Sequence, residues 1–530
     1  QIALSPDLAQ DPIASRTKIQ LSVGPAAAMD VAGLTTQLDR YPYGCAEQTT
    51  SRALPLLYSN ALSAQSGLPT DPALKERIQA AVERVLEMQD ASGAFGIWGP
   101  RNGDLWLTSY VTDFLTRAKE SGYGVKPQAL SQALDKLQNF VSYAQDFEKG
   151  GEARAYALYV LARNGRAAMG DLRYYVDSRL ERFSTPLAKA QLGAALAMLG
   201  DKERAEKAFK AALDGMGAKD ADLSRIDYGS GLRDGAALLT LAAETKSSAI
   251  EAPKLAGVIA KAYASKQYTS TQEQAWMLLA ARALDHQAKD TQLAVNGQPH
   301  KGPYTRQLSV ADLSQGQLTI SNDGDTAVDA VISIIGAALT PEPAASKGFR
   351  IERTYYTLDG KKVDALSAGG AKATARQSDR FVVVLKVEAM EEGGRIMLVD
   401  RLPAGFEVEN PRLVDSGDVK TLDWLKSDIK PEHTEFRDDR FVAAFNLFGR
   451  QAQANRGNAD ADDNNGDDAD TNTTTADAAK GPAKTATVAY IVRAVTPGSF
   501  VHPAATVEDM YRPGRFARTA SGRLDVSAKE

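Results

Sequence analysis

Residues 41–52 read Tyr-Pro-Tyr-Gly-Cys-Ala-Glu-Gln-Thr-Thr-Ser-Arg, and they contain the single cysteine of the chain, Cys45. Gln48 follows three residues later, which places the two side chains on one face of a helical turn. A Cys45 thiolate that attacks the side-chain carbonyl of Gln48 expels ammonia and closes an internal thioester. A thiolate leaves more readily than an amine or an alkoxide, because the pKa of its acid is ~8.5 against ~10 or above. The pair therefore predicts an acylating agent that must be shielded from water.

A lone cysteine in a helix is more often a small buried apolar residue, and Cys-x-x-Gln by itself arises by chance. The neighbouring residues make this pair specific. Residues 44–48 (GCAEQ) resemble the thioester signature GCxEQ of the α2-macroglobulin and complement superfamily. The flanking residues 41–43 and 49–51 resemble the bacterial α2-macroglobulins in particular.

Two further stretches carry the same resemblance, which extends over nearly the whole chain. Residues 106–111 (WLTSYV) are similar to the WLTAYV stretch after the thioester, and residues 268–273 (YTSTQE) are similar to a late STQE segment. The family order is a CUB strand, a helical toroid with the thioester, the rest of the CUB domain and a macroglobulin-like sandwich. The resemblance thus implies a multidomain α + β fold with an α/α toroid inserted in a β-sandwich CUB domain, followed by a C-terminal immunoglobulin-like sandwich.

The domain boundaries are placed where the residue pattern changes from one typical of helices to one typical of strands. Residues 29–286, the expected thioester domain, are rich in amphipathic segments joined by short Gly, Asp and Pro connections. Residues 72–89 are an example, with Ile78, Val82 and Val85 on one apolar stripe. The segments recur at an irregular spacing that predicts antiparallel helical hairpins. That spacing fits an α/α toroid and an open solenoid equally well.

The rest of the chain predicts β-structure. Residues 1–28 are assigned to the first part of the CUB domain, residues 287–340 to its second part and residues 341–530 to the C-terminal macroglobulin-like domain. Short alternating runs separated by Asn-Gly and Asp-Gly pairs are typical of strands and turns. Residues 451–484 contain no aromatic or large aliphatic side chain, so we expect a disordered acidic loop there.

Composition excludes several classes of function. Lys plus Arg is 62 and Asp plus Glu is 67 in 530 residues, and the net charge of −5 argues against a nucleic-acid partner. One cysteine allows no intrachain disulfide, and the four histidines lack HExxH spacing, so we expect no metal and no cofactor. Residues 460–471 fail an EF-hand match, with Asn465 and Thr471 at the positions of the Gly and Glu.

The resemblance implies a function as a broad-spectrum endopeptidase inhibitor. A protease is trapped, and its lysine amines are linked covalently to Gln48 in a single-turnover acylation, so the protein is not an enzyme. No histidine lies between Cys45 and His286 to redirect the thioester to hydroxyls, which predicts a preference for amines. Bacterial members of the family act in the periplasm in envelope defence, alongside a penicillin-binding protein. We expect the chain to be a fragment, with membrane attachment only through an N-terminal lipid of the full-length protein.

The resemblance also points to residues around the thioester. Tyr41 and Tyr43 flank Cys45, and Met510 and Tyr511 lie in a terminal segment that docks on the toroid in the family, so these four are expected to shield the bond. Glu47 either takes part in the helix start or polarises the site. Two alternatives stay open: a macroglobulin-like scaffold with an unreacted Cys/Gln pair, and an α/α-toroid enzyme of the terpenoid-cyclase type, which would need a carboxylate pair in its cavity.

Overall fold

The fold is known from a computed structural model of the chain. It describes residues 16–40, 44–60, 71–217, 225–284, 290–309, 311–312, 318–325, 327–336, 339–367, 372–390, 394–409, 424, 429–447 and 484–529. These residues form two compact units, residues 1–339 and residues 340–530, and each is described by itself.

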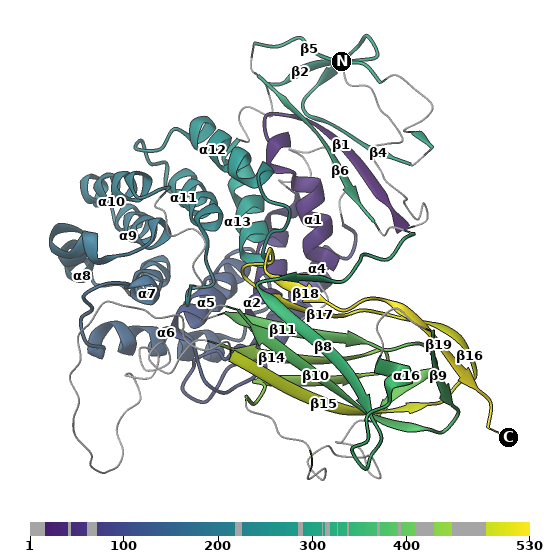
Figure 1. The fold of residues 1–530 in the computed structure, drawn as a ribbon. Coiled ribbons are helices and arrows are strands. Elements are labelled where there is room, and N and C mark those ends of the chain that lie inside the picture. The colour runs from purple at the N-terminus through teal and green to yellow at the C-terminus, as the bar shows by residue number, and fades with distance from the viewer. Residues whose placement is uncertain are drawn as a thin grey trace, which may run out of the picture. The chain divides into compact units, whose positions relative to one another are not determined.

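The first unit consists of α-helical hairpins and a small β-domain (Figure 1). Within each hairpin one helix is largely buried and the other has an exposed face. The largely buried helices are α2 (Ala46–Ala53), α5 (Leu105–Glu120), α7 (Glu152–Arg163), α9 (Pro186–Met198), α11 (Gly231–Thr245) and α13 (Thr271–Ala281). The outer helices are α1 (Val31–Arg40), α4 (Leu74–Leu86), α6 (Pro127–Tyr143), α8 (Met169–Tyr174), α10 (Lys202–Asp214) and α12 (Ala252–Ala264).

The amino-acid pattern explains which helix is inside. The sequence of α9, PLAKAQLGAALAM, is apolar or small on nearly every face, as expected of a helix surrounded by others. The sequence of α4 instead buries only a stripe formed by Ile78, Val82 and Val85. The inner helices pack in the order α2, α5, α7, α9, α11 and α13, and α13 packs back against α2. Among the described residues, the packing of the inner helices therefore closes on itself.

The inner helices α5, α7, α9, α11 and α13 run in the same direction, because residues at their C-terminal ends line one cavity: Ser121, Arg163, Met198, Thr245 and Arg282. Several of them begin at a side-chain cap. Asp104, Thr185, Ser230 and Ser270 each accept a hydrogen bond from a backbone N–H in the first turn of α5, α9, α11 and α13. Such caps satisfy amide groups that have no partner within the helix. The N-terminal ends of these helices, α2 included, accordingly meet at one end of the bundle.

The β-domain of the first unit joins segments from both sides of the helices. Strand β1 (Lys18–Gly24) pairs antiparallel with β4 (Tyr304–Leu308) and with β6 (Asp329–Ile335). A second small sheet contains β3 (Gln298–Lys301), β2 (Gln292–Val295) and β5 (Ile320–Asn322). The two sheets share a core that includes Ile19, Leu21 and Leu293. A strand before the helices and strands after them thus belong to one domain.

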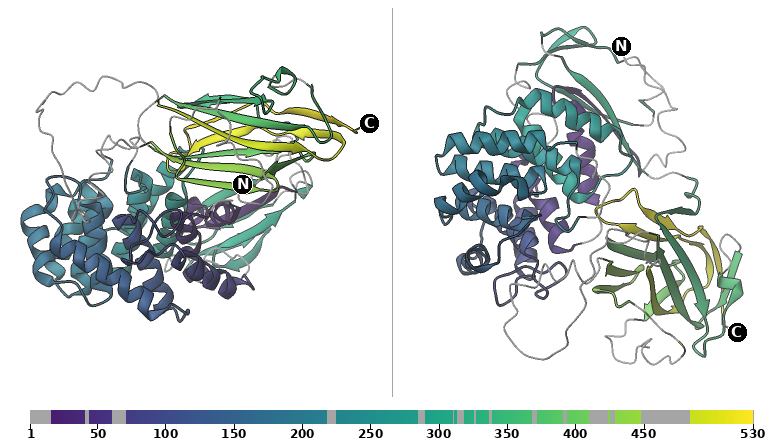
Figure 2. Two further views of the ribbon diagram at one scale, coloured as in Figure 1. Left: turned by 90° about the horizontal axis from the view of Figure 1, so that it is seen from below. Right: turned by 60° about the vertical axis from the view of Figure 1, so that its left-hand side comes forward.

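The second unit is a β-sandwich whose strands form layers in both views of Figure 2. One sheet has the order β12 (Phe406–Glu409), β15 (Lys484–Ala494), β10 (Arg380–Ala389), β8 (Phe349–Tyr356). The other has the order β13 (His433–Arg437), β14 (Arg440–Asn446), β11 (Arg395–Arg401), β17 (Ala505–Asp509), β18 (Phe516–Arg518), β7 (Ala345–Lys347). A three-stranded sheet of β16 (Gly498–His502), β19 (Gly522–Ser527) and β9 (Lys372–Arg376) and the short helix α16 (Asp364–Ser367) complete the unit.

The predicted combination of a helical domain with several β-sheets is confirmed. The expected disordered loop, residues 451–484, lies outside the described residues except at its last position. A search of the described helices finds none with the length and apolar character needed to span a membrane.

Candidate functional site

Cys45 and Gln48 form a reciprocal pair at the start of α2. Cys45 is the N-cap residue, and its sulfur accepts a hydrogen bond from the Gln48 backbone N–H at 3.4 Å. In return, the Cys45 backbone N–H donates to Gln48 Oε1, also at 3.4 Å. This is a capping box, an arrangement usually built from Ser or Thr and from Glu or Gln. The predicted proximity of the thiol and the amide side chain therefore follows from the geometry of a helix start.

The pair is inaccessible to solvent. Both Cys45 and Gln48 have 0% of their surface exposed. The backbone N–H of Ala46 donates to the carbonyl oxygen of Ile97 at 2.8 Å, which ties the turn to the segment before α5. Water exclusion is what an activated acyl bond requires.

Glu47 lies between the two residues in sequence and is also fully buried. Its carboxylate accepts hydrogen bonds from Ser51 Oγ at 2.5 Å and from Gln272 Nε2 at 2.9 Å. Thr271 Oγ1 donates to the same carboxylate at 3.0 Å. Thr271 and Gln272 are the first two residues of α13, so Glu47 connects the starts of two neighbouring inner helices. These bonds support both a helix-start role and an influence on the pair beside it.

Aromatic rings cover this polar group inside the bundle. The Tyr110 hydroxyl lies 2.9 Å from Ser51 Oγ, and burial together with the nearby Glu47 raises the pKa of Tyr110 well above its ordinary value. The ring centroid of Trp106 lies 5.4 Å from that of Tyr110 and 5.3 Å from that of Tyr156. Tyr110 is therefore a neutral hydroxyl at every physiological pH.

Arg233 on α11 extends this polar network. Arg233, fully buried, donates to Gln272 Oε1 at 3.3 Å, to Asp227 Oδ2 at 2.7 Å and to Asp234 Oδ1 at 2.8 Å. Burial by itself would raise the pKa of Asp227, but Arg225 and Arg233 outweigh it and hold that pKa far below the usual range. A continuous chain of polar contacts thus leads from Glu47 through Gln272 to charged groups of α11.

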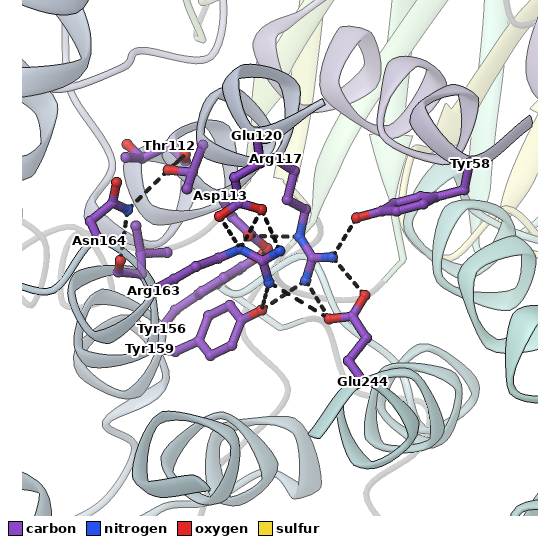
Figure 3. A network of polar contacts seen from close by, with 12 residues as sticks. Tyr58, Thr112, Asp113, Arg117, Glu120, Tyr156, Tyr159, Arg163, Asn164 and Glu244 are labelled. Atoms are coloured by element: carbon purple, nitrogen blue, oxygen red, sulfur yellow. Dashed lines mark hydrogen bonds and ion pairs between the residues drawn. The ribbon is translucent and has the colours of Figure 1, made fainter. Parts of the chain in front are cut away.

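A second buried network lies at the other ends of the inner helices (Figure 3). Arg117 on α5 donates to Asp113 at 2.8 Å, to Glu244 at 2.7 Å and to Tyr159 at 2.7 Å. Glu244 also accepts from Arg282 at 3.3 Å. An open cavity of ≈ 630 Å³ at this end is lined by Tyr58, Glu120, Ser121, Arg163, Ala197, Met198, Glu244, Thr245 and Arg282.

The structure brings together three of the residues expected at the site, Cys45, Gln48 and Glu47. Tyr41 and Tyr43 lie outside the described residues. Met510 and Tyr511 belong to the second unit, directly after β17, where Met510 N–H donates to Arg395 O at 2.9 Å. Within the described part of the chain, no cluster of three or more His, Cys, Asp or Glu side chains has the arrangement of a metal site.

Sequence reasoning missed the contact partners of Glu47. Ser51, Thr271 and Gln272 bond to Glu47, and Tyr110 contacts Ser51; all four lie within stretches that resemble the family, but the sequence alone gives none of them a role. A signal was present, because Ser270 and Glu273 have the S-x-x-E spacing of a capping box. That signal places Thr271 and Gln272 in the first turn of a helix, although it does not say what they face.

Comparison with known proteins identifies the class. The model of the A-macroglobulin TED domain matches residues 17–147, and that of the bacterial α2-macroglobulin MG10 domain matches residues 348–454 and 467–514. The helical unit with the Cys45–Gln48 pair and the following sandwich thus define a protein of the macroglobulin class.

Relatives narrow the assignment. The chain is 32% identical to α2-macroglobulin of Escherichia coli K12 over 93% of its own length and 29% of the relative's. It is 30% identical to α2-macroglobulin of Xylella fastidiosa Temecula1 over 99% of its own length and 31% of the relative's. The crystal structure of native Escherichia coli α2-macroglobulin from domain MG7 to the C-terminus aligns with a TM-score of 0.80 at 28% identity, covering 99% of this chain and 80% of that one. The chain belongs to the bacterial α2-macroglobulins and spans about a third of the length of these curated relatives.

Proposed function

We propose that Cys45 and Gln48 form an internal thioester with which the protein links attacking proteases covalently to itself. The observation that carries this proposal is the reciprocal hydrogen bonding of the two residues in a fully buried helix start. By this chemistry the protein is a broad-spectrum endopeptidase inhibitor and not an enzyme, since each thioester reacts once.

The chemistry balances with the residues present. The Cys45 sulfur loses its proton and attacks the Gln48 side-chain carbon, and the amide nitrogen leaves as ammonia. The Cys45 N–H that donates to Gln48 Oε1 polarises the carbonyl and would stabilise negative charge on that oxygen. At 3.4 Å this hydrogen bond is long, and it would have to shorten along the reaction to stabilise that charge. In the second step a lysine amine adds to the carbonyl, Cys45 departs as a thiol, and an amide joins the two proteins.

The relatives support this function. Several are named α2-macroglobulin. A crystal structure of Salmonella α2-macroglobulin reacted with methylamine aligns with a TM-score of 0.80 at 28% identity, covering 99% of this chain and 32% of that one. Methylamine is a small analogue of a lysine side chain, and its reaction with a relative is consistent with aminolysis of a thioester.

The architecture assigned by resemblance is also a proposal. The closed packing of the inner helices supports an α/α toroid. The pairing of β1 with β4 and β6 supports a CUB domain into which the helices are inserted. The match to the MG10 domain supports a macroglobulin-like sandwich at the C-terminal end.

The resemblance to the family supports proposals for shielding, location and partners. Tyr41, Tyr43, Met510 and Tyr511 are proposed to cover the thioester, and replacing any of them by Gly is expected to speed its hydrolysis. The full-length protein is proposed to act in the periplasm, tethered to the inner membrane by an N-terminal lipid and alongside a penicillin-binding protein in envelope defence. Cell fractionation of the source bacterium, with antibodies to this chain, tests the location.

The decisive experiment is the intact mass of freshly purified protein, with and without methylamine, together with a thiol assay. The proposal predicts a mass lower by one ammonia, no reactive thiol, and methylamine uptake that releases one thiol per chain. Peptide mapping of residue 48 then separates the alternatives. Glu at this position identifies a thioester that has hydrolysed, whereas unmodified Gln in every molecule would overturn the proposal and leave an interaction scaffold.

A further inference from the structure

We propose that Glu47 and Gln272 are positioning residues that hold the Cys45–Gln48 turn in its reactive geometry. This inference rests on the proposed thioester and adds residues that the chemistry itself does not name. It starts from the 2.9 Å hydrogen bond between Gln272 Nε2 and Glu47 Oε1, which joins α13 to α2.

Glu47 is an unusual residue to bury at this point. Its carboxylate is fully enclosed and receives its hydrogen bonds from the neutral donors Ser51, Thr271 and Gln272. It lies in the first turn of α2 and also at the first turn of α13. Both helix N-termini favour a negative charge at this place, because their backbone dipoles point toward it. The carboxylate therefore draws the starts of the two helices together.

The orientation of Gln272 is fixed from its other side. Its Oε1 accepts from Arg233 Nη1 at 3.3 Å, which leaves only its Nε2 to face Glu47. Arg233 in turn is held by Asp227 and Asp234. A buried polar network with every member paired is rigid and specifies one arrangement. The position of Glu47, and with it the adjacent residue Gln48, is thereby set by α11 as well as by α13.

Such rigidity matters for acyl transfer. The sulfur and the carbonyl carbon must be held at near-attack distance, and a displacement of about 1 Å can reduce a rate by about 100-fold. The same contacts also stabilise the fold. Experiments must therefore separate a role in positioning from a role in stability alone.

Exchanging the two side chains, Glu47 and Gln272, distinguishes a role in positioning from a role in stability. Glu47→Gln removes the carboxylate, and Gln272→Glu places two carboxylates face to face. The double variant Glu47→Gln/Gln272→Glu restores a donor–acceptor pair in reverse, and its new carboxylate faces Arg233. Tyr159→Phe is the matched control, because it removes a buried hydrogen bond with Arg117 at the other ends of the same inner helices.

The readouts are the fraction of protein that carries the thioester, the rate of methylamine-driven thiol release and the thermal midpoint. Each single swap variant is expected to lower the thioester fraction or change the release rate by about tenfold or more, as expected for misplaced reacting groups. The double variant should recover most of the wild-type behaviour. Tyr159→Phe should lower the thermal midpoint and leave the thioester unchanged.

The inference alone would be overturned by single variants with a wild-type thioester fraction and release rate, or by a Tyr159→Phe variant that loses the thioester in proportion to its stability. A double variant that folds but stays as impaired as the singles also counts against it. Wild-type protein that never contains a thioester would overturn the proposed function, and this inference with it.

Discussion

The Gln48 backbone N–H donates to the Cys45 sulfur at 3.4 Å, so the atom proposed to become acylated is also the cap of helix α2. Serine is among the best N-cap residues, and its hydroxyl can accept the same hydrogen bond. Helix capping and thioester chemistry therefore make different demands on position 45, and substitutions there can separate them.

Cys45→Ser is expected to keep the free energy of unfolding within about 1 kcal/mol of wild type, because the cap is preserved. It should take up no methylamine, since a serine alkoxide is too poor a leaving group to give an activated ester. Cys45→Ala should lose the cap as well, at a further cost of about 1 kcal/mol. Urea unfolding and intact mass check both variants, and methylamine uptake by the Ser variant would contradict the assignment.

The buried arginine network predicts a large effect on stability. Arg117 is 1% exposed and compensates Asp113 and Glu244, which are 0% and 18% exposed. Arg117→Met leaves these carboxylates without their main partner and is expected to cost about 3–5 kcal/mol in the free energy of unfolding. The control is Arg84→Met, which breaks an exposed ion pair with Glu87 and should cost less than about 1 kcal/mol. If urea unfolding gave the same loss of unfolding free energy for both variants, burial would not determine how much each ion pair contributes to stability.

His502 of the second unit predicts a dependence of stability on pH. Burial, with a smaller contribution from Arg353, lowers the pKa of His502 to about 3, so the ring is neutral, and its Nε2 is hydrogen-bonded to the Tyr355 hydroxyl at 2.8 Å. The unfolded chain binds a proton near pH 6.5, and the folded protein does so only near pH 3. The unfolded state therefore binds more protons between these values, and stability falls as pH decreases.

At pH 5 the expected loss relative to pH 7 is about 2 kcal/mol from this group. His502→Gln should remove that part of the slope, because glutamine does not titrate. The measurement is urea unfolding of wild type and variant at both pH values. A variant with the same slope as wild type would assign the pH dependence to other groups.

Local spacing made much of the helical part predictable. The apolar stripe of residues 72–89 predicts a helix, and α4 spans Leu74–Leu86. The meeting of Cys45 with Gln48 is equally local, since a three-residue separation and a helix start are enough to produce it. Short strands such as β9 and β12 cannot be predicted in this way, because so few residues show too little alternation to distinguish a strand from a loop.

Contacts between distant segments could not be predicted in the same way. Glu47 and Gln272 are separated by 225 residues, and they meet only because α13 packs against α2. Hydrophobic periodicity shows that each helix has a buried face and carries no information about its neighbour. The same limit applies to Arg117, whose partner Glu244 lies 127 residues away.

The nucleophile preference of the proposed thioester gives the last prediction. No histidine lies between Cys45 and His286, and the described buried groups beside the pair include the carboxylate of Glu47, to which the hydroxyls of Ser51 and Thr271 donate hydrogen bonds. A hydroxyl needs a base or a nucleophilic relay to attack, whereas an unprotonated amine attacks directly. Methylamine should therefore release one thiol per chain, and glycerol at the same concentration should release no more than water does.

The release rate should rise about tenfold for each pH unit below the amine pKa, about 10.4 for a lysine side chain, because only the neutral amine reacts. Thiol release followed from pH 7 to pH 9 with methylamine and with glycerol checks both statements. A glycerol ester found at residue 48 by peptide mapping would show that some other group activates hydroxyls, and the amine preference would then be wrong.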